Sequence, residues 1–274
     1  MDQQAMQVST KNLPRFSIII IGYNIEDYIT RAIESAENQD FENKEIIVVN
    51  DCSTDATESK ILECCEKYKN IQYIKHEVNK KAGGARNTGL KIAKGEYIVF
   101  LDGDDYLAGP TVLTKLDEKI GKDKTDVIYL GFKIEGDREE LVIPTEETCT
   151  KNYKAAKDKY PNPWSKCWRS NFLKENNIKF KEGRFYEDVL FVYQGVMLSN
   201  SYKIADYVTH IYTSGRVGSM TTKMKLKNIE DTLLNIQDLA QIQKENPTPE
   251  AEYIIEKEKN MCKKRLQSIL DDIK

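Results

Sequence analysis

The chain has 274 residues, of which 40% are hydrophobic and 31% are charged, a balance typical of a globular protein with a sizeable core. Its formal net charge of −3 gives no reason to expect nucleic acid as a partner, and no apolar run approaches the ~20 residues that span a bilayer. Six cysteines, none in a C-x-x-C pair, and two histidines argue against a zinc site or a disulfide framework and favour reduced thiols in a cytoplasmic compartment.

After a polar start, apolar strands and amphipathic helices alternate along the first half of the chain. Residues 1–14 lack a basic, apolar leader, so we expect a flexible tail and no secretory signal. Strands are expected at 16–21, 45–49, 71–75 and 97–101, and helices at 26–37, 55–69 and 85–93, with Ser53 or Thr54 capping the second helix. Alternation at this spacing predicts βαβ units, and therefore an α/β fold with a mostly parallel sheet.

The fourth of these strands, Tyr97–Leu101, ends abruptly in Asp102-Gly103-Asp104-Asp105. A buried strand that delivers carboxylates at its carboxyl end is how open α/β sheets place charge in a ligand crevice. Two aspartates separated by a glycine can offer hard oxygen ligands to Mg²⁺ or Mn²⁺, while phosphate oxygens take the remaining positions of the ion. A solvated acidic turn explains this segment equally well when it is taken alone.

The pattern changes after Asp105. Apolar segments at 126–132 and 140–143 flank the turn residues 135–137 and predict a β-hairpin. Residues 163–175 and 187–199 have helical spacing, and 226–273 contains two amphipathic helices separated by a proline-rich break.

Polar segments follow the expected strands at the edge where such a sheet binds ligands. They are Gly22–Asn24, Asn50–Asp55, Gly83–Gly89 and Asp102–Asp105. Tyr23 could stack on a ring, Asp51 could accept a hydrogen bond from a base N–H, and Arg86 could donate to a carbonyl or phosphate. Each also has an ordinary structural explanation, with Asp51 and Asp55 as helix caps, Tyr23 as an aromatic at the rim of the core and the glycine pair as a turn. Their joint placement around one crevice favours a ligand site.

Taken together, these segments resemble the family 2 glycosyltransferases, which have the GT-A fold. The motifs of that family that run S-I-I-I-P-x-Y-N, V-x-D-x-S-x-D-x-T, G-x-x-x-A-R-N-x-G and F-x-D-x-D-D correspond to Ser17–Asn24, Val49–Thr57, Gly83–Gly89 and Phe100–Asp105. Further likenesses in the second half are Asn162–Arg169, Phe185–Phe191 and Tyr212–Met220, so the match extends from about residue 16 to 222. Ile21 and Gly22 depart from the usual Pro and Val, which puts the detailed contact of Tyr23 in doubt.

By position, the resemblance implies donor-binding roles for the first set of motif residues. Tyr23 and Asp51 would hold the nucleobase with help from Arg86. Asp102 would hold the ribose, and Asp104 would ligate the divalent ion, Mn²⁺ or Mg²⁺, that bridges the diphosphate.

The resemblance also implies that Asp188 is the catalytic base. The resemblance also implies further residues that either contact the acceptor or support the residues that contact the substrates. They are Asp105, Trp164, Glu187, His210 and Arg216. Simpler explanations exist for several of these residues: Asp188 could cap its helix, Trp164 and Trp168 fit a core equally well, and a single histidine beside a strand is more often structural.

The implied activity is that of an inverting glycosyltransferase. It would transfer a sugar from a nucleotide-diphospho-sugar, with UDP-sugars favoured, to a hydroxyl of a glycan or lipid-linked acceptor. The implied context is bacterial cell-surface polysaccharide synthesis in the cytoplasm, at the inner face of the membrane. The sequence identifies neither the sugar nor the acceptor.

Two other functions compete with this one. A phosphatase with a D-x-D nucleophile needs Thr or Val two residues after its second Asp, whereas Asp104 is followed by Asp105-Tyr106. A non-catalytic nucleotide-sugar-binding module would also keep the donor motifs, but the presence of Asp188 argues against it. Release of nucleoside diphosphate from a donor separates an enzyme from such a module.

We expect three parts in the chain. The tail at 1–14 precedes a GT-A catalytic domain at 15–222, whose nucleotide-sugar half is 15–106 and whose acceptor half is 107–222. A helical appendage at 223–274 follows, with one apolar stripe expected at Leu226, Ile229, Leu233, Ile236, Leu239 and Ala240. The appendage could pack on the catalytic domain, which is the simplest expectation, associate as a homodimer, or lie on a membrane surface through its many lysines.

Overall fold

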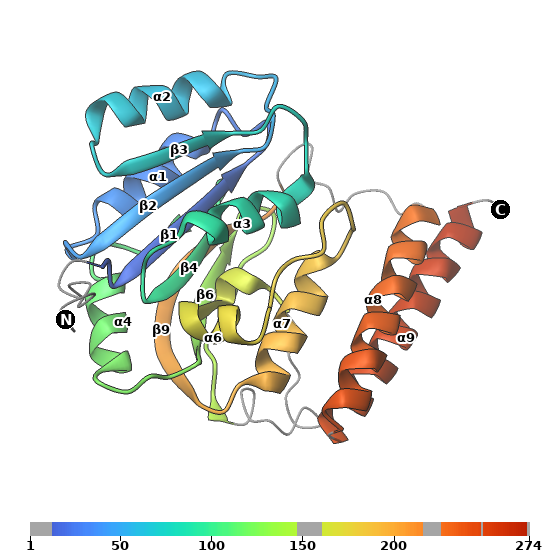
Figure 1. Cartoon of the computed structure of the whole chain (residues 1–274). Coiled ribbons are helices and arrows are strands. Elements are labelled where there is room, and N and C mark those ends of the chain that lie inside the picture. Colours follow the sequence, from blue (N-terminus) through green and yellow to red (C-terminus); the bar gives the residue numbers. More distant parts are fainter. Residues whose placement is uncertain (1–12, 147–160, 216–225, 248, 273–274) are drawn as a thin grey trace, which may run out of the picture.

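A mixed nine-stranded sheet runs through the described part of the chain and carries helices on both faces (Figure 1). The computed structural model describes residues 13–146, 161–215, 226–247 and 249–272. The strands are β1 (Phe16–Gly22), β2 (Lys44–Asn50), β3 (Ile71–Lys75), β4 (Tyr97–Asp102), β5 (Tyr106–Leu107), β6 (Val127–Glu135), β7 (Glu140–Val142), β8 (Lys166–Arg169) and β9 (Tyr202–Thr213). Their order in the sheet is β3-β2-β1-β4-β8-β6-β9-β5, and β7 pairs with β6.

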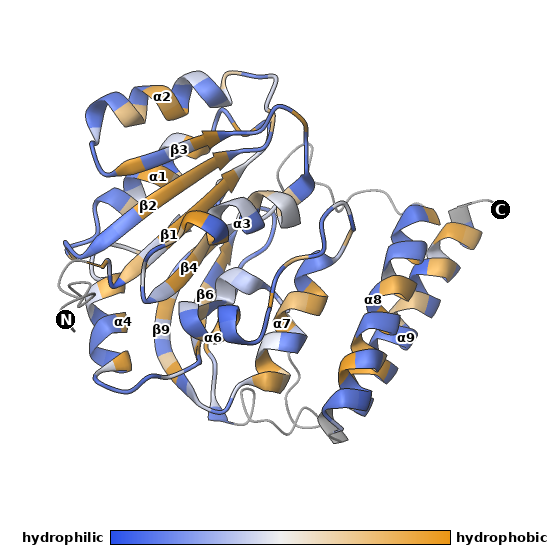
Figure 2. Ribbon diagram, in the orientation of Figure 1, coloured by the Kyte–Doolittle hydropathy of each residue, from blue (hydrophilic) through white to orange (hydrophobic). Residues whose placement is uncertain are grey.

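The first four strands form the parallel half of the sheet that the alternating pattern predicts. β1 pairs in parallel with β2 on one side and with β4 on the other, and β2 pairs with β3. Their runs of isoleucine and valine are buried on both faces, as parallel strands covered by helices require (Figure 2). β8 adds antiparallel to β4, so the second half of the sheet is mixed.

Alternate residues of each strand belong to two separate cores. Ile18 and Ile20 of β1 pack in the core that is covered by α1 (Ile29–Glu37), α2 (Thr57–Lys67) and α4 (Val112–Ile120). Ile19 of β1 and Phe100 of β4 point to the opposite face. The helices on that face are α3 (Lys81–Ile92), α6 (Ser170–Glu175) and α7 (Glu187–Leu198), and beyond α7 lie α8 (Leu226–Glu245) and α9 (Pro249–Asp272).

The helix expected at 163–175 is wrong in its first half. A short 3₁₀ helix, η2 (Pro163–Ser165), leads into strand β8, and only α6 is helical. Cys167 packs in one core and Trp168 in the other, which is the two-residue period of a strand. The tryptophans at 164 and 168 imitate helical spacing, because one belongs to the 3₁₀ turn and the other to the strand.

The expected cap of the second helix is also wrong. α2 begins at Thr57, and the Oδ1 atom of Asp55 accepts the hydrogen bond of the Thr57 amide at 3.0 Å. Ser53 and Thr54 instead join the loop after β2 to the loop after β1. The hydroxyl of Ser53 accepts a hydrogen bond from the Asn24 amide, and the amide of Thr54 donates to the side chain of Asn24.

The C-terminal helices pack on α7, which was the simplest of the three expectations for this segment. Leu239 of α8, with Ile254 and Ile255 of α9, joins the core beneath α3, α6 and α7. The stripe expected on α8 is wrong in part, because Leu226 and Leu233 are 71% and 51% exposed. The buried positions of its first turns are polar instead: Asn228, Asp231, Thr232 and Asn235.

Among the described residues, no helix has the length and apolar character needed to cross a membrane. The tail expected at 1–14 falls almost wholly outside these residues.

Candidate active site

The candidate site lies at the carboxyl edge of the parallel strands, where strand order reverses. The chain proceeds from β1 outward to β2 and β3, and then returns to place β4 on the other side of β1. Such a reversal leaves a crevice between the strand ends, where open α/β sheets bind ligands. Tyr23 follows β1 directly and is 44% exposed, so its ring is available at this crevice.

Asp51 lies buried at the end of β2 and holds the neighbouring loop. Its Oδ1 atom accepts hydrogen bonds from the Lys80 amide at 2.8 Å and lies 2.7 Å from Nδ1 of His76. The other ring nitrogen of His76 lies 2.8 Å from the hydroxyl of Thr88 on α3. Within the described residues, Oδ2 of Asp51 has no hydrogen-bond partner. Asp51 does not cap α2, so the helix-cap explanation for it is wrong.

The Asp102–Asp105 segment makes a tight turn at the end of β4. The amide of Asp105 bonds to the carbonyl of Asp102, and the amide of Gly103 bonds to the carbonyl of Ile21 at 2.9 Å. A Cβ at Gly103 would lie 2.7 Å from that carbonyl oxygen, so only glycine lets the turn approach β1. Asp102 and Asp104 are partly exposed, whereas Asp105 is buried.

Asp105 faces inward and joins this turn to the end of β9. Its Oδ1 atom accepts a hydrogen bond from the Thr213 amide at 2.8 Å. Burial raises the pKa of Asp105 well above its usual range, and the negative charges of Asp104 and Asp102 add to the effect. Direct contact with an acceptor, one of the expectations for Asp105, does not fit this position.

Arg86 of α3 joins the two acidic segments of the site. Only 5% of the residue is exposed, and its guanidinium binds Asp102 at 2.7 Å and Glu187 at 3.0 Å. These charges hold the pKa of Arg86 above its usual range despite its burial. Both terminal nitrogens are bound to carboxylates, a role that the sequence did not predict, and the expected contact of Arg86 with the nucleotide stays a prediction. The guanidinium connects the strand-end turn to the start of α7.

Glu187 and Asp188 form the first turn of α7. Burial and the neighbouring charge of Asp188 raise the pKa of Glu187 to about 7. Burial also raises the pKa of Asp188, although Arg86 opposes the shift. Gly83 permits the close approach of α3, because a Cβ there would lie 2.8 Å from Cγ of Glu187.

Asp188 is the less buried of the two carboxylates. Its Oδ1 atom accepts the hydrogen bond of the Val189 amide at 2.9 Å, but the residue before the helix is Tyr186, which offers no side-chain cap. Asp188 therefore lies inside the helix and is not its N-cap residue.

The remaining expected residues are buried or lie outside the described part. Trp164 packs in an aromatic cluster, stacked on Tyr212 with the ring centroids 5.7 Å apart, and Trp168 is fully buried. His210 donates from Nε2 to the carbonyl of Phe100 at 3.1 Å, and burial lowers its pKa to about 4, so the ring is neutral and connects β9 to β4. The core explanation of both tryptophans and the structural explanation of His210 fit these positions. Arg216 lies outside the described residues.

The acidic turn fits a hard divalent cation that shares its coordination with a ligand. Among the described residues, no group of three histidine, cysteine or acidic side chains is arranged to hold an ion by itself. Carboxylate oxygens are nevertheless the donors that Mg²⁺ and Mn²⁺ favour, and both ions commonly complete their shell with phosphate oxygens. Burial is the main cause of the raised pKa of Asp105, and the charges of Asp104 and Asp102 add to it; a cation bound at this turn would relieve that repulsion.

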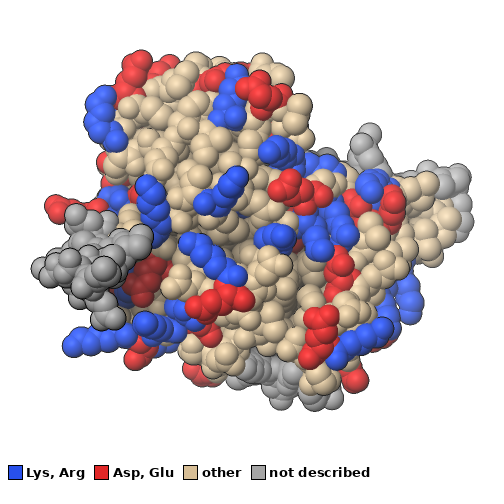
Figure 3. Space-filling view, in the orientation of Figure 1, with Lys and Arg blue, Asp and Glu red and all other residues tan. Residues whose placement is uncertain are grey.

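A separate cavity of about 790 Å³ lies beside α3 and is also lined by residues of β3, β4 and α6. His76, Thr88, Lys91, Lys174 and Lys179 line it, whereas the exposed residues of the strand-end crevice do not. Basic and acidic side chains are interspersed over this face of the molecule (Figure 3). The cavity therefore differs from the site at which the acidic segments meet.

The comparisons with known proteins identify the family. A family model described as "Glycosyl transferase family 2" matches residues 17–192. The chain belongs to glycosyltransferase family 2. One similar protein is the poly(ribitol-phosphate) beta-N-acetylglucosaminyltransferase TarS of Staphylococcus aureus. It is 32% identical to this chain over 212 residues, which cover 74% of this chain and 36% of TarS. The chain thus spans little more than a third of that relative.

Two further comparisons support the same family and fold. The Escherichia coli enzyme named UDP-Glc:alpha-D-GlcNAc-diphosphoundecaprenol beta-1,3-glucosyltransferase WfaP is 44% identical over 116 residues, covering 42% of this chain and 44% of WfaP. The crystal structure of S. aureus TarS 1-349 in complex with UDP-GlcNAc matches with a TM-score of 0.73 and 28% identity, covering 87% of this chain and 69% of that one. These matches confirm the GT-A fold and the family expected from the sequence motifs.

Proposed function

We propose that this member of family 2 is a metal-dependent, inverting glycosyltransferase that uses a UDP-sugar. The observation that carries the proposal is the convergence on Arg86 of the acidic turn after β4 and the acidic start of α7. One acidic segment suits the metal-bound donor, and the other suits removal of a proton from the acceptor.

The donor would lie across the ends of β1, β2 and β4. The exposed ring of Tyr23 stacks on the base, and Oδ2 of Asp51 accepts from a base N–H. The carboxylate of Asp102 would accept from a ribose hydroxyl, and Asp104 would hold the divalent ion, whose positive charge would stabilise the diphosphate leaving group. TarS and WfaP, whose complex or name specifies UDP-GlcNAc or UDP-Glc, support a UDP-sugar as donor.

The acceptor hydroxyl would lose its proton to Asp188. The hydroxyl oxygen forms a bond to the anomeric carbon while the bond from that carbon to the diphosphate oxygen breaks, which releases nucleoside diphosphate. A raised pKa brings the carboxylate closer to the proton affinity that a general base needs. Attack from the face opposite the leaving group inverts the anomeric centre, and the names of both relatives specify beta products.

Arg86 has a different role in this proposal from the one expected from the sequence. It fixes the distance between Asp102 and Glu187, and so the distance between the donor and the first turn of α7. Its buried charge also keeps the surrounding carboxylates from repelling one another.

The acceptor would be a hydroxyl of a cell-surface glycan or of a lipid-linked sugar. The names of TarS and WfaP specify poly(ribitol-phosphate) and a diphosphoundecaprenol-linked sugar, respectively. A place at the inner face of the membrane would suit such acceptors. That location, a homodimer and a membrane contact through the lysines of the C-terminal helices stay predictions.

A donor screen tests the proposal. Nucleotide sugars are added to the protein with and without Mn²⁺, and both the melting temperature and the release of nucleoside diphosphate are measured. A UDP-sugar with Mn²⁺ should raise the melting temperature, because a ligand that binds the folded state stabilises it, and it should be consumed slowly even with water as acceptor. Binding without any turnover would support a non-catalytic sugar-nucleotide module instead.

A further inference from the structure

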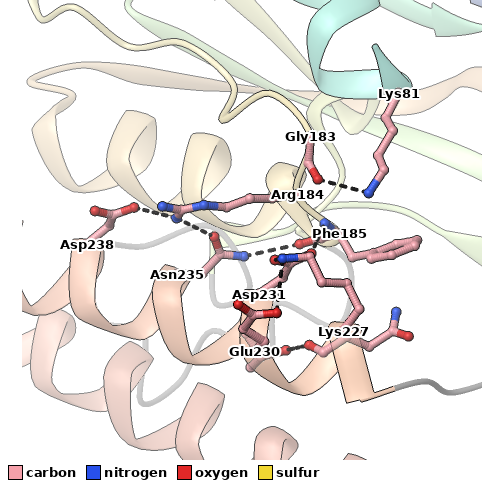
Figure 4. Close-up of polar contacts among 11 residues, drawn as sticks. Lys81, Gly183, Arg184, Phe185, Lys227, Glu230, Asp231, Asn235 and Asp238 are labelled. Atoms are coloured by element: carbon pink, nitrogen blue, oxygen red, sulfur yellow. Dashed lines mark hydrogen bonds and ion pairs between the residues drawn. The ribbon is translucent and has the colours of Figure 1, made fainter. Parts of the chain in front are cut away.

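Helix α8 presents a polar face to the segment that leads into α7. Its buried side chains in this region are Asn228, Asp231, Thr232 and Asn235, where a helix that merely covers a core would bury apolar residues. Figure 4 shows Asp231, Asn235 and Asp238 directed at residues 183–185. That segment immediately precedes Glu187 and Asp188.

Two of these side chains bind the backbone of the segment. Oδ2 of Asp231 accepts the hydrogen bond of the Phe185 amide at 2.9 Å. The amide of Asn235 donates to the carbonyl of Tyr186 at 2.9 Å and lies 3.4 Å from the carbonyl of Phe185. Asp231 is fully buried and Asn235 almost so. Their bonds therefore fix the backbone with little competition from water.

Charged neighbours hold this arrangement from both sides. Lys227 pairs with Asp231 at 2.9 Å, which compensates the buried carboxylate. Arg184 binds Asp238 at 2.6 Å and Asn235 at 3.2 Å, so a side chain of the 183–185 segment also binds α8 (Figure 4). On the opposite side, Lys81 of α3 donates to the carbonyl of Gly183 at 2.8 Å.

Tyr186 connects this segment to α7, the helix that begins with Glu187 and Asp188. It has φ +58° and ψ +35°, a left-handed conformation that is unfavourable for a bulky residue unless its surroundings enforce it. The guanidinium of Arg265 from α9 lies 3.6 Å from the centre of its ring. Because the side chain of Tyr186 does not cap α7, the backbone of Tyr186 sets the direction in which the first turn of the helix begins.

We propose that the C-terminal helix pair positions the Glu187–Asp188 pair, with Asp231 and Asn235 as positioning residues that act through the backbone of Phe185 and Tyr186. The inference rests on the proposed role of Asp188. Apolar contacts, among them those of Leu239, Ile254 and Ile255, already attach α8 and α9 to the core, and the buried polar face makes a different kind of contact. Directional hydrogen bonds define one geometry, which apolar packing alone does less sharply.

The test compares Asn235→Ala with Gln237→Ala in the full-length protein. Both remove an amide side chain from α8, but Gln237 is exposed, and within the described part of the chain it makes no contact with the segment. In Asn235→Ala we expect kcat for UDP-sugar turnover to fall by ~10²-fold, the scale of a misplaced reacting group, with unchanged KM and Kd for the donor. Gln237→Ala should leave both values unchanged. A folded Asn235→Ala protein with the kcat of the wild type would overturn the proposal.

A conservative variant separates positioning from simple loss of stability. Asp231→Asn keeps an oxygen that accepts from the Phe185 amide and should retain most of the wild-type kcat, whereas Asp231→Leu should lose it. If both variants lower kcat equally, the acceptor at residue 231 is not what matters. If Asn235→Ala does not fold, Arg265→Lys, at a partly exposed residue, tests the same connection through Tyr186 and should lower kcat without changing the donor Kd. An unchanged kcat in that variant counts against the proposal.

Hydrogen exchange distinguishes failure of this inference from failure of the proposed function. Amides of residues 185–189 should exchange faster in Asn235→Ala than in the wild type, while those of β1 and β4 should not change. If the wild type consumes no donor, the glycosyltransferase proposal fails. Faster exchange at residues 185–189 in Asn235→Ala would still show that Asn235 fixes the backbone of this segment. Equal exchange in both proteins would overturn the positioning role whatever the activity.

Discussion

The two walls of the proposed crevice are built in different ways. The donor wall consists of the ends of β1, β2 and β4, whose positions follow from backbone pairing between parallel strands. The opposite wall is the first turn of α7, whose direction depends on a left-handed tyrosine and on side chains from α8. A local pattern therefore fixes one wall, and contacts between distant parts of the chain fix the other.

This difference separates binding from chemistry. Donor contacts should survive changes in α8 and α9, because the proposed donor residues all lie at the ends of β1, β2 and β4, in the first half of the chain. The proton-accepting group should be sensitive to both halves, because Arg86 ties Glu187 to Asp102 across them. Four substitutions test this division.

The largest effect is expected for Asp188→Asn. Asparagine occupies the same space and can still accept from the Val189 amide, but it cannot take the acceptor's proton. Transfer should therefore fall by ~10²–10⁴-fold, with donor affinity and melting temperature nearly unchanged. Transfer assays and calorimetry with the donor measure the two quantities. Near-wild-type transfer would move the base to another carboxylate, with Glu187 the nearest choice.

A smaller effect, confined to the donor wall, is expected for Asp104→Ala. Loss of one carboxylate ligand should remove the gain in nucleotide affinity that Mn²⁺ provides, ~10–100-fold, and leave the affinity without metal unchanged. Asp27→Ala is the matched control, since Asp27 is an exposed aspartate near the same edge that makes no described contact. Calorimetric titrations of UDP with and without Mn²⁺ give the result. An Asp104→Ala protein that keeps the full metal dependence would exclude Asp104 as a ligand.

The donor wall is also the part that could be predicted from sequence. Runs such as Phe16–Ile21 and Tyr97–Leu101 are buried on both faces, so their composition alone identifies parallel strands, and the polar residues after them must share an edge. Asp51, Asp102 and Asp104 were found in this way. The family motifs located Asp188, because its helix is a largely buried apolar segment whose pattern alone marks no catalytic residue.

The opposite wall could not be predicted in the same detail. The ion pairs of Arg86 require knowledge of where α7 lies against α3, and Arg86 was therefore expected at the nucleotide. Strands β8 and β9 were not predicted. β8 has only four residues, one of them a tryptophan, and β9 mixes apolar and polar residues that are partly exposed. On α8, an apolar stripe was expected to face the core, but polar residues of this helix bind the backbone of residues 185 and 186. His76, which holds Asp51, carried one signal: it follows β3, the strand beside β2.

Asp51→Ala should weaken binding of the nucleotide by ~1–3 kcal/mol, the scale of a hydrogen bond to a charged group. The variant also leaves the Lys80 amide and the ring of His76 without their acceptor, so the free energy of unfolding should fall too. Asp55→Ala is the control, because Asp55 lies in the same loop and its carboxylate accepts hydrogen bonds from the amides of Thr57 and Glu26. Both variants should lose stability, but only Asp51→Ala should lose affinity in calorimetry. Equal nucleotide affinity in the two variants would make Asp51 a structural residue.

The smallest effect is a pH dependence of stability that originates at the junction of the two walls. Burial and the charge of Asp188 raise the pKa of Glu187 from 4.5 to about 7 in the folded protein, whereas the unfolded chain releases the proton near the ordinary value. Between these pH values the folded state binds more protons than the unfolded state, so the free energy of unfolding should decrease as pH rises. Glu187→Gln is always neutral and should flatten the decrease, while Asp102 still pairs with Arg86. Part of the slope should persist, because the pKa values of Asp188 and Asp105 are raised as well. Urea unfolding at intervals from pH 4.5 to 7 measures the slope in both proteins, and identical slopes would mean that Glu187 is ionised throughout this range.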